Sequence, residues 1–351
     1  MPAQAAIAAS QQVGPYHPGS DNLFSLHPFI NKPHAHHWLN YIYHEKSNIH
    51  ANERLSILMN LRDVYREYQT KLDHNDCQQM AEMCKYLCDW KLLIDVVRQG
   101  LALEPDSVQL RCSLIQACWC LGDHQLAIVL SRRYALEVPA NKFFYDYYKK
   151  ISAWQRFSEK KILTSSGLLH GKRIYLQPLG HQHINDFAWQ YADPGIADLC
   201  CLPEFNNDMQ WHAWLADDMN DAARTTCAVM HSEYGFIGCV GLIRYKQLGF
   251  FYYWLGKDFQ GYGFGPEAAE LLLLYHTNHF NMQSCFAKVY KYNHPSLGAI
   301  KKLGFTLLPV RAAEPYEKEY FFYRGVEENI HIVRRDLELL MKFLAVDICF
   351  R

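Results

Sequence analysis

The chain has 351 residues, half of them hydrophobic and one fifth charged, and its 35 Lys and Arg offset 36 Asp and Glu to a net charge of -1. This balance lacks the overall positive field that non-specific nucleic-acid binding or a polybasic membrane contact needs. The longest apolar runs, such as Leu271–Leu274, are far shorter than the roughly 20 residues of a membrane-spanning helix. The short apolar runs predict a soluble protein, and the length predicts two domains, each with its own core.

Neither the start of the chain nor its cysteines indicate secretion. The first residues, MPAQAAIAASQQVG, have no Lys or Arg ahead of their alanines and so lack the charged start of a secretory signal. Twelve cysteines occur without a CxxC pair, and the cluster of His34, His36 and His37 has no acidic or Cys partner at ligand spacing. We expect reduced cysteines packed in the core, no metal, and a cytoplasmic location.

The character of the sequence changes near residue 45. Before it, Pro, His, Asn and Gly recur too often for a long helix, so residues 1–45 are expected to be extended or partly disordered. From Glu53 to about Trp154, apolar residues recur three and four apart, as at Leu55, Leu58 and Met59, without strand-like alternation. Residues 46–157 are therefore predicted to form an all-helical domain.

An internal repeat is visible in this helical part. The segment Leu87 to Pro105, LCDWKLLIDVVRQGLALEP, aligns without gaps on LGDHQLAIVLSRRYALEVP, which begins 34 residues later. A 34-residue helix-turn-helix period that ends in proline resembles the tetratricopeptide repeat, although Asp89–Trp90 departs from the usual glycine. The resemblance implies either a concave surface that binds peptides or a structural support for the second domain. The aromatic segment KFFYDYYKK is expected to pack between repeats, or else to bind a peptide.

The remainder of the chain is predicted to be a mixed α/β domain over residues 173–325, after a polar linker at 158–172 and before a last amphipathic helix at 326–351. Strands are expected at Arg173–Leu176, Thr225–His231, Phe236–Tyr245, Phe250–Leu255, Ser284–Tyr290, Phe305–Leu308 and Glu319–Arg324. Helices are expected at His183–Tyr191, Met209–Asn220, Pro266–Phe280 and Pro295–Leu303.

The clearest chemical signal is a glycine-rich turn between a strand and a helix. The strand Phe250–Leu255 is followed by QGYGFG, residues 260–265, and by Pro266, which is expected to open a helix as its first residue. Glycines let the backbone approach a ligand closely, and the N–H groups of the turn and of the helix N-terminus suit an anion such as a pyrophosphate. The spacing is neither GxGxxG nor that of a P-loop.

A second motif lies downstream, after the helix and one more strand. It consists of Asn293-His-Pro-Ser296 and Lys302-Leu-Gly-Phe305. Together, the Q-x-x-G-x-G turn, N-x-x-S and K-L-G-F at these intervals resemble the GNAT acyltransferase superfamily. More narrowly, they resemble its branch that contains the ribosomal-protein N-terminal acetyltransferases. The resemblance covers about residues 173–325 and leaves out the helical half.

This resemblance implies a GNAT acyltransferase fold of α/β type behind the helical repeats, with acetyl-CoA as the acyl donor. In this superfamily the fourth and fifth strands diverge, and the donor's arm pairs with the fourth strand, here along Tyr252–Leu255. Pro266 departs from the pattern by removing one N–H. Carried over to this chain, the residues that bind the donor are Tyr253, Trp254, Leu255, Gln260, Gly261, Tyr262, Gly263, Phe264, Gly265, Asn293 and Ser296.

Direct transfer to an amine needs a base for the amine, a stabilised oxyanion and an acid for the leaving thiolate. Ser296 is the first candidate for the acid, with Tyr292 and Tyr290 behind it, while Asn293 and His294 lie near enough to join the catalytic set. The base is expected in the loops beside the acceptor, among Glu204, Asp208, Glu314, Tyr316 and Glu317. Glu314 is the candidate that we retain, although a solvated loop carboxylate explains each acidic residue at least as well.

These features predict an enzyme that transfers acetyl from acetyl-CoA to an amine of a peptide or protein, with the repeats helping to recruit the acceptor. Two alternatives stay open: acetylation of a small-molecule amine with structural repeats, and a non-catalytic acyl-CoA-binding scaffold. A deep closed pocket favours the small molecule, and an open groove that continues into the repeat surface favours the peptide. Acylation of aminoacyl-tRNA would need a local basic face. Acceptor identity, acyl chain length and oligomeric state are left open.

Overall fold

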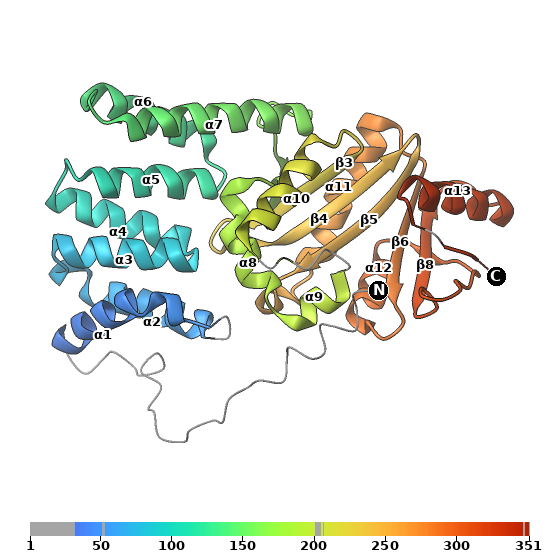
Figure 1. Cartoon of the computed structure of the whole chain (residues 1–351), viewed down its shortest axis with the longest axis horizontal. Helices are drawn as coiled ribbons and strands as arrows, with labels where there is room; N and C mark the ends of the chain where they lie inside the picture. The colour runs from blue at the N-terminus through green and yellow to red at the C-terminus, as the bar shows by residue number, and fades with distance from the viewer. Residues whose placement is uncertain (1–31, 51–52, 201–204, 206, 347, 351) are drawn as a thin grey trace, which may run out of the picture. The chain divides into compact units, whose positions relative to one another are not determined.

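The computed structural model describes residues 32–50, 53–200, 205, 207–346 and 348–350 (Figure 1). The chain divides into two compact units, with the break after Lys71. The described part of the first unit contains helices α1 (Lys32–His44) and α2 (Arg54–Tyr68) and two short 3-10 turns, η2 (Lys46–Asn48) and η3 (Gln69–Lys71).

Helix α1 corrects the expectation that the chain is extended up to residue 45. Pro33 is the second helical residue, where the N–H that it lacks has no intrahelical partner. Trp38, Leu39 and Ile42 are buried and share one face at helical spacing. The expectation for residues 1–31 lies outside the described residues.

The second unit begins with five helices whose boundaries repeat. They are α3 (His74–Leu87), α4 (Trp90–Leu103), α5 (Val108–Cys120), α6 (His124–Glu137) and α7 (Lys142–Lys161). Successive starts of α3, α5 and α7 are 34 residues apart, as are those of α4 and α6. The repeat in the sequence is therefore a repeat of helix pairs, stacked in Figure 1, while its tetratricopeptide class stays a prediction.

The turns within the two pairs repeat as well. Asp89 and Asp123 each cap the helix that follows, because their carboxylates accept a hydrogen bond from the N–H three residues on, at 3.1 Å in both turns. Each also donates its own N–H to a carbonyl five residues back, that of Cys84 or Cys118, at 2.9 Å. The shared aspartate therefore caps the second helix of each pair, and Cys88, with a φ of 62°, takes the left-handed conformation that Gly122 takes in the second copy, with a φ of 82°.

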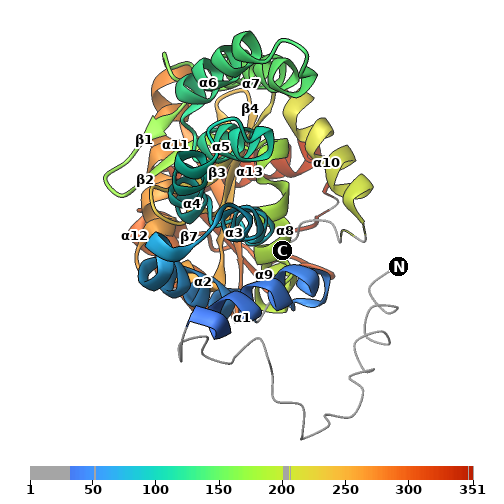
Figure 2. The ribbon, with the colours of Figure 1, turned by 90° about the vertical axis from the view of Figure 1, so that its left-hand side faces the viewer.

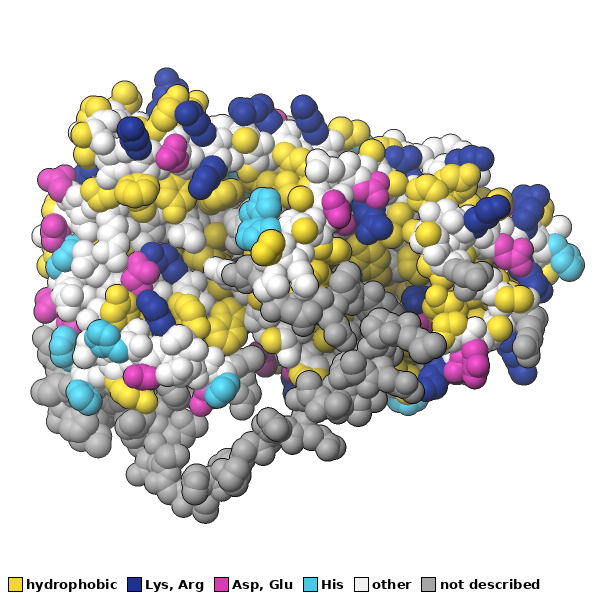
Figure 3. All heavy atoms as spheres, in the orientation of Figure 1, with side chains coloured by type: hydrophobic (Ala, Val, Ile, Leu, Met, Phe, Trp, Pro, Cys, Tyr) yellow, Lys and Arg dark blue, Asp and Glu magenta, His cyan; other side chains and the backbone are white. Residues whose placement is uncertain are grey.

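Helix α7 carries the aromatic segment and runs into the predicted linker. Phe144 is buried between helices, as expected if this segment packs between repeats. Phe143 and Tyr145, in contrast, are 67% and 52% exposed. Figure 3 shows hydrophobic side chains beside Lys and Arg over α6 and α7. The segment predicted to be a linker is helical up to Lys161, and the chain is held beyond it because Ser158 donates a hydrogen bond to the Gly167 carbonyl at 2.8 Å.

The rest of the second unit is built on a sheet of eight strands in the order β1-β2-β3-β4-β5-β6-β8-β7. The strands are β1 (Leu169–His170), β2 (Ile174–Pro178), β3 (Arg224–His231), β4 (Gly235–Tyr245), β5 (Leu248–Leu255), β6 (Ser284–Tyr290), β7 (Thr306–Leu307) and β8 (Glu319–Gly325). Neighbouring strands are antiparallel except β5 and β6, which are parallel. All seven predicted strands are present, and only the two-residue β1 was not predicted.

Helices cover both faces of this sheet, as Figures 1 and 2 show. Helices α8 (Ile184–Tyr191), α9 (Pro194–Cys200) and α10 (Asp208–Asn220) lie on one face, where they share a core with Ala228 and Trp254. Helix α11 (Phe264–Phe280) lies on the other, on a core that includes Val229 and Leu255, and α12 (His294–Lys302) joins it. Helix α13 (Ile330–Phe343) packs on the α8 face of β6 and β8. Of these helices only α9 was not predicted.

Polar contacts join the helix pairs to the helices that cover the sheet within this unit. Trp90 on α4 donates to a carboxylate oxygen of Asp186 on α8 at 2.9 Å, and Trp189 on α8 donates to the Tyr86 carbonyl at 2.9 Å. At the end of α7, Lys161 donates to the Asp221 carbonyl at 2.8 Å, just after α10. The helix pairs therefore hold two helices, α8 and α10, that cover the face of the sheet described below. Among the described residues no helix is long and apolar enough to cross a bilayer.

Candidate active site

Strands β5 and β6 separate along their length. They pair at only three positions, Leu248 with Ser284, Gly249 with Cys285 and Phe250 with Phe286, although both strands continue well beyond. A cavity of about 1040 Å³ occupies the opening, lined by Phe251–Leu255 on one side and residues 287–290 on the other. The predicted divergence is thus present, and it leaves the backbone edge of β5 free for an extended ligand to pair with.

The glycine-rich turn lies at the end of β5 and lines the same cavity through Gln260, Gly261, Gly263 and Gly265. Gly261 and Gly263 have φ angles of 84° and 83°, a left-handed conformation that glycine adopts without strain. Within the described residues the N–H groups of Gly261, Tyr262 and Gly263 have no backbone or side-chain acceptor. A cradle of free N–H groups before a helix N-terminus is suited to a phosphate.

The helix after this turn begins earlier than expected. Helix α11 starts at Phe264 with Gly263 as its N-cap, so Pro266 is the third helical residue rather than the first. Proline is tolerated there because the first four N–H groups of a helix have no intrahelical partner. Just before this helix, the carbonyl of Tyr262 accepts a hydrogen bond from Nη1 of Arg173 at 2.8 Å.

Arg173 and Glu267 brace the turn, and the sequence reasoning missed both. The Arg173 guanidinium pairs with Glu267 at 2.9 Å and stacks on the Phe264 ring, while the N–H groups of Lys172 and Arg173 donate to the other Glu267 oxygen. Because these residues are 94 positions apart, no local spacing indicates the contact. Gly265 packs against β5, since a Cβ atom on it would lie 2.6 Å from the Tyr253 ring.

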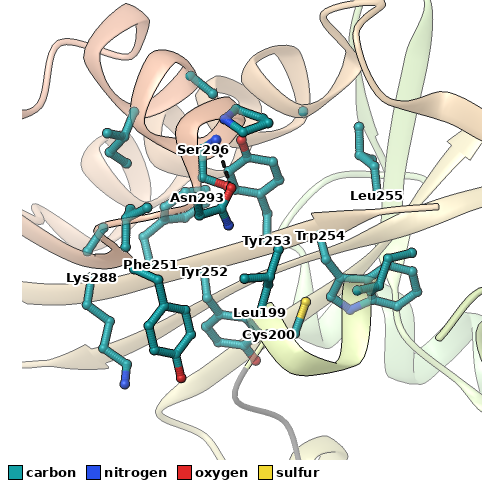
Figure 4. A pocket seen from close by; sticks show the side chains of 18 of the residues that line it. Leu199, Cys200, Phe251, Tyr252, Tyr253, Trp254, Leu255, Lys288, Asn293 and Ser296 are labelled. Carbon is teal, nitrogen blue, oxygen red and sulfur yellow. Dashed lines mark hydrogen bonds between the residues drawn. The ribbon is translucent and has the colours of Figure 1, made fainter. Parts of the chain in front are cut away.

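Asn293 and Ser296 lie on the side of β5 to which Tyr253 points (Figure 4), and they line the same cavity as this turn. Asn293 is the N-cap of α12, and its Oδ1 accepts a hydrogen bond from the Ser296 N–H at 3.2 Å. The Ser296 side chain lies close enough to the Tyr253 hydroxyl to lower its pKa. Burial has the larger effect and raises the pKa of Tyr253 to about 12. The N-x-x-S motif therefore positions a serine that is coupled to a neutral tyrosine.

The other residues predicted to bind the acyl donor and the other catalytic candidates do not all line the cavity. Trp254 and Leu255 are buried and line the cavity, whereas Tyr262 is exposed and Phe264 is buried, and neither lines it. Tyr292 and His294 line the cavity but are solvent-exposed, with Tyr292 stacked on Tyr290.

The predicted base falls in a different place from the other candidates. Glu314 is exposed and does not line the cavity. Glu204 lies outside the described residues, and Asp208 begins α10 with a side chain that the structure does not describe.

Sequence reasoning did not select the polar groups that line the opposite side of the cavity. Glu319 on β8 is buried and paired with Lys288 on β6 at 2.6 Å, and its second oxygen has no hydrogen-bond partner in the described structure. Asp217, Asp218 and Asp221 line the cavity from the end of α10 and the turn after it, with Arg224 beside them. Among the described residues no group of His, Cys, Asp and Glu is arranged to hold a metal ion.

Comparison with known proteins identifies the kind of domain to which many of the residues around this cavity belong. Residues 173–306 match the family model of the acetyltransferase (GNAT) domain, and no curated protein matches the chain. Similar solved structures include the Microcin C7 self immunity acetyltransferase MccE, determined with acetyl-CoA and AMP, at 19% identity and a TM-score of 0.40 over 44% of this chain and 93% of that one.

Two further similar structures are bacterial. One is an acetyltransferase from Salmonella typhimurium that modifies the N-terminal serine of ribosomal protein L7/L12, with 13% identity and a TM-score of 0.41 over 46% of this chain and 99% of that one. The other is the ribosomal-protein-S5-alanine acetyltransferase from Vibrio fischeri, with 15% identity and a TM-score of 0.40 over 46% and 97%. The family model decides the assignment: between residues 173 and 306 this chain is a GNAT acetyltransferase domain.

Proposed function

We propose that the chain is an N-acetyltransferase that moves an acetyl group from acetyl-CoA to an amine of a peptide or protein by direct attack. The observation that carries this proposal is the opening between β5 and β6 beyond Phe250 and Phe286, with the glycine turn at its end. Such an opening admits a narrow extended molecule, and the turn offers N–H groups to an anion at one end of it. Acetyl-CoA has both parts, a pantetheine arm and a pyrophosphate.

The donor's position follows from these two features. The pyrophosphate is held by the N–H groups of Gly261, Tyr262 and Gly263, with Arg173 and Glu267 keeping the turn in shape. The arm lies along the free edge of β5, where unpaired backbone groups replace the hydrogen bonds that β6 no longer makes. The thioester then lies beside Tyr253 and Ser296, which line the same stretch of cavity.

The chemistry on this side of β5 is protonation of the leaving thiolate. When the amine attacks the thioester carbonyl, the C–S bond breaks and its electron pair goes to sulfur, which must take up a proton. Ser296 Oγ donates that proton, and the neighbouring Tyr253 hydroxyl replaces it. A free N–H on the edge of β5 stabilises the negative charge that develops on the carbonyl oxygen.

The acceptor enters from the other face of the sheet. There the cavity is lined by apolar side chains, Ile196, Leu199 and Trp214, and by the carboxylates of Asp217, Asp218 and Asp221. This mixture suits a protonated amine on a partly apolar carrier, such as a peptide N-terminus, because carboxylates attract the cation before it loses its proton.

A specific observation favours small-molecule amines as a second candidate. No residue of α3 to α7 is among those that line the cavity, so the groove that would join the cavity to the repeat surface has no support in the described residues. In that case the repeats only support α8 and α10, through Asp186 and the Asp221 carbonyl. The peptide reading instead requires the repeats to contact parts of the acceptor far from its amine.

The experiment that tests the proposal combines acetyl-CoA binding with mass spectrometry. Binding is measured by calorimetry, and the chain is then incubated with acetyl-CoA and either decapeptides that begin with Ser, Ala or Met or a panel of small alkylamines. Acetylated peptides support the proposal, and acetylated small amines alone support the second candidate. Binding of acetyl-CoA without transfer to any amine would overturn both and leave an acyl-CoA-binding scaffold.

A further inference from the structure

Three residues on adjacent strands lie side by side on the acceptor face. In the register of the sheet, Thr226 on β3 pairs with Gly241 on β4, and Gly241 pairs with Tyr252 on β5. A Cβ atom at Gly241 would lie 2.2 Å from Cζ of the Tyr252 ring. The glycine therefore lets the tyrosine ring lie across β4, and the two hydroxyl oxygens of Tyr252 and Thr226 come within 3.1 Å.

The contact continues to a buried carboxylate. Thr226 Oγ1 donates to Oδ1 of Asp218, near the end of α10, at 2.8 Å. Because the threonine hydroxyl has one proton and gives it to Asp218, it accepts the proton of the Tyr252 hydroxyl in the other bond. The three side chains thus form a directed chain of hydrogen bonds, and the Tyr252 oxygen keeps a lone pair for a further donor.

The environment of Asp218 suits a group that takes up a proton. The residue is 3% exposed, and burial raises the pKa of its carboxyl, an effect reduced by the Thr226 bond and by Lys161 and Arg224. The charge of Asp221 also raises the pKa of Asp218. Lys161 reaches this site from α7 and donates to backbone carbonyls of α10 and its turn rather than to the Asp218 side chain.

Tyr252 and Asp218, the two ends of the chain of hydrogen bonds, are both residues that line the cavity. Figure 4 shows Tyr252 pointing to the side of β5 that faces Leu199 and Cys200, while Tyr253 points to Ser296. The thiolate acid and this chain of hydrogen bonds therefore lie on opposite sides of the strand along which the thioester would lie. Tyr252 is the residue of β5 that carries a hydroxyl group on this face.

We propose that Tyr252, Thr226 and Asp218 form the relay that deprotonates the acceptor amine, a role that rests on the N-acetyltransferase function proposed above. The ammonium gives one proton to the Tyr252 oxygen, Tyr252 passes its own proton to Thr226, and Thr226 passes its proton to Asp218. The neutral nitrogen then attacks the carbonyl carbon and the C–S bond breaks. The nitrogen loses its second proton to solvent, and solvent restores the proton that Ser296 and Tyr253 gave to the thiolate. Asp218 later releases its proton to solvent, so that one proton is released for each acetyl group transferred. Tyr252 is the catalytic residue, and Thr226 and Asp218 act through it.

The other acidic groups are less suited to this role. Glu319 is already paired with Lys288, so a proton on it would break a buried ion pair and leave Lys288 without its partner. Glu314 is exposed and lies away from the cavity. Asp218 is the buried carboxylate among the described lining residues whose hydrogen bonds lead to a hydroxyl on β5.

The test compares two acceptor probes in the full chain. One probe is the peptide or alkylamine that the wild-type chain acetylates, which is protonated at neutral pH, and the other is hydroxylamine, which is already neutral there. We expect Tyr252→Phe to lower kcat for the protonated amine by about 10²-fold, the usual contribution of a general base. Its KM for acetyl-CoA and its rate with hydroxylamine are expected to stay within about twofold of wild type.

Asp218→Asn and Gly241→Ala extend the test. Asp218→Asn keeps an oxygen for Thr226 but cannot take up the proton, so the acidic limb of its kcat/KM profile should move to higher pH, towards the pKa of the free amine. Gly241→Ala should have the kinetic effect of Tyr252→Phe by displacing the ring. Tyr323→Phe, on β8, is the matched control and is expected to keep wild-type rates with both probes.

The outcomes separate the relay from the proposed function. Full activity of Tyr252→Phe with the protonated amine, or an equal loss with hydroxylamine, would overturn the relay and leave the acetyltransferase proposal standing. A wild-type chain that binds acetyl-CoA and acetylates neither probe would overturn the proposed function, and the relay with it.

Discussion

Tyr252 and Tyr253 are adjacent on β5, and their side chains lie on opposite faces of the sheet. The Tyr252 hydroxyl lies 3.1 Å from Thr226 Oγ1, on the face covered by α8 and α10, and the Tyr253 side chain points towards Ser296, on the face covered by α11 and α12. The alternation of a β-strand produces this arrangement from two consecutive residues. Proton removal from the acceptor and proton delivery to the leaving group can therefore be tested separately.

The first prediction concerns the proposed acid. Ser296→Ala should lower kcat by about 10²-fold, because the thiolate then leaves without a positioned proton donor. Acetyl-CoA affinity should change far less, since the pyrophosphate contacts stay intact. Stopped-flow turnover and calorimetric Kd values measure the two effects. Ser284→Ala, a serine at the start of β6 that does not line the cavity, is the control, and unchanged turnover in Ser296→Ala would remove Ser296 from the acid role.

The second prediction concerns the glycine turn. Gly263→Asp should weaken acetyl-CoA binding by 10²-fold or more, because like charges about 4 Å apart repel by about 4 kcal/mol near a protein surface. Part of the loss comes from strain, since Gly263 has a φ of 83°. Gly304→Asp controls for that strain, because Gly304 has a φ of 75°, has nothing within 4 Å of an added Cβ atom, and does not line the cavity. Equal Kd values for wild type and Gly263→Asp would refute the assignment of the turn.

Much of the fold was predictable because each strand carries its own local pattern. The run Ser284–Tyr290 was predicted with the bounds that β6 has, and the glycine turn was located from spacing alone. The helix at Lys32–His44 was missed because its Pro and His residues indicate a loop, while the burial of Trp38 and Ile42 that stabilises it is a tertiary effect.

The long-range contacts around the cavity were not predictable in the same way. Thr226, Gly241 and Tyr252 meet only through the register of three strands, and Arg173 and Glu267 meet across 94 residues. Neither contact has a spacing that a single sequence can show. The one available signal was Gly241, since a glycine inside a strand often marks the close approach of another group.

The third prediction separates the two roles proposed for the repeats. If α6 and α7 bind remote parts of a peptide acceptor, replacing the exposed Phe143 and Tyr145 by Ser should raise KM for a long peptide by about tenfold, since buried aromatic contacts contribute most to such interfaces. KM for a tripeptide with the same N-terminus should stay the same. Tyr320→Ser, an exposed tyrosine on β8, is the matched control. Equal KM values for long and short peptides in all variants would assign the repeats a structural role.

The fourth prediction concerns stability at acidic pH. Burial lowers the pKa of both His183 and His276 to about 3, with the charges of His124 on the first and of Arg244 and His279 on the second as smaller causes. His183 lies where the helix pairs meet the sheet, and its Nδ1 accepts a hydrogen bond from the Gly180 N–H at 3.0 Å, which a proton on that atom would break.

The sign of the effect follows from the two states. Between the unfolded pKa of about 6.5 and the folded value of about 3, the unfolded chain binds more protons, so the free energy of unfolding falls as the pH falls through this window. Each histidine contributes about 1.4 kcal/mol per pH unit, so the two together should remove about 4 kcal/mol between pH 7 and pH 5. Urea unfolding at both values measures the difference. His276→Leu should reduce it by about half, and a variant with the full wild-type difference would show that His276 is protonated in the folded chain.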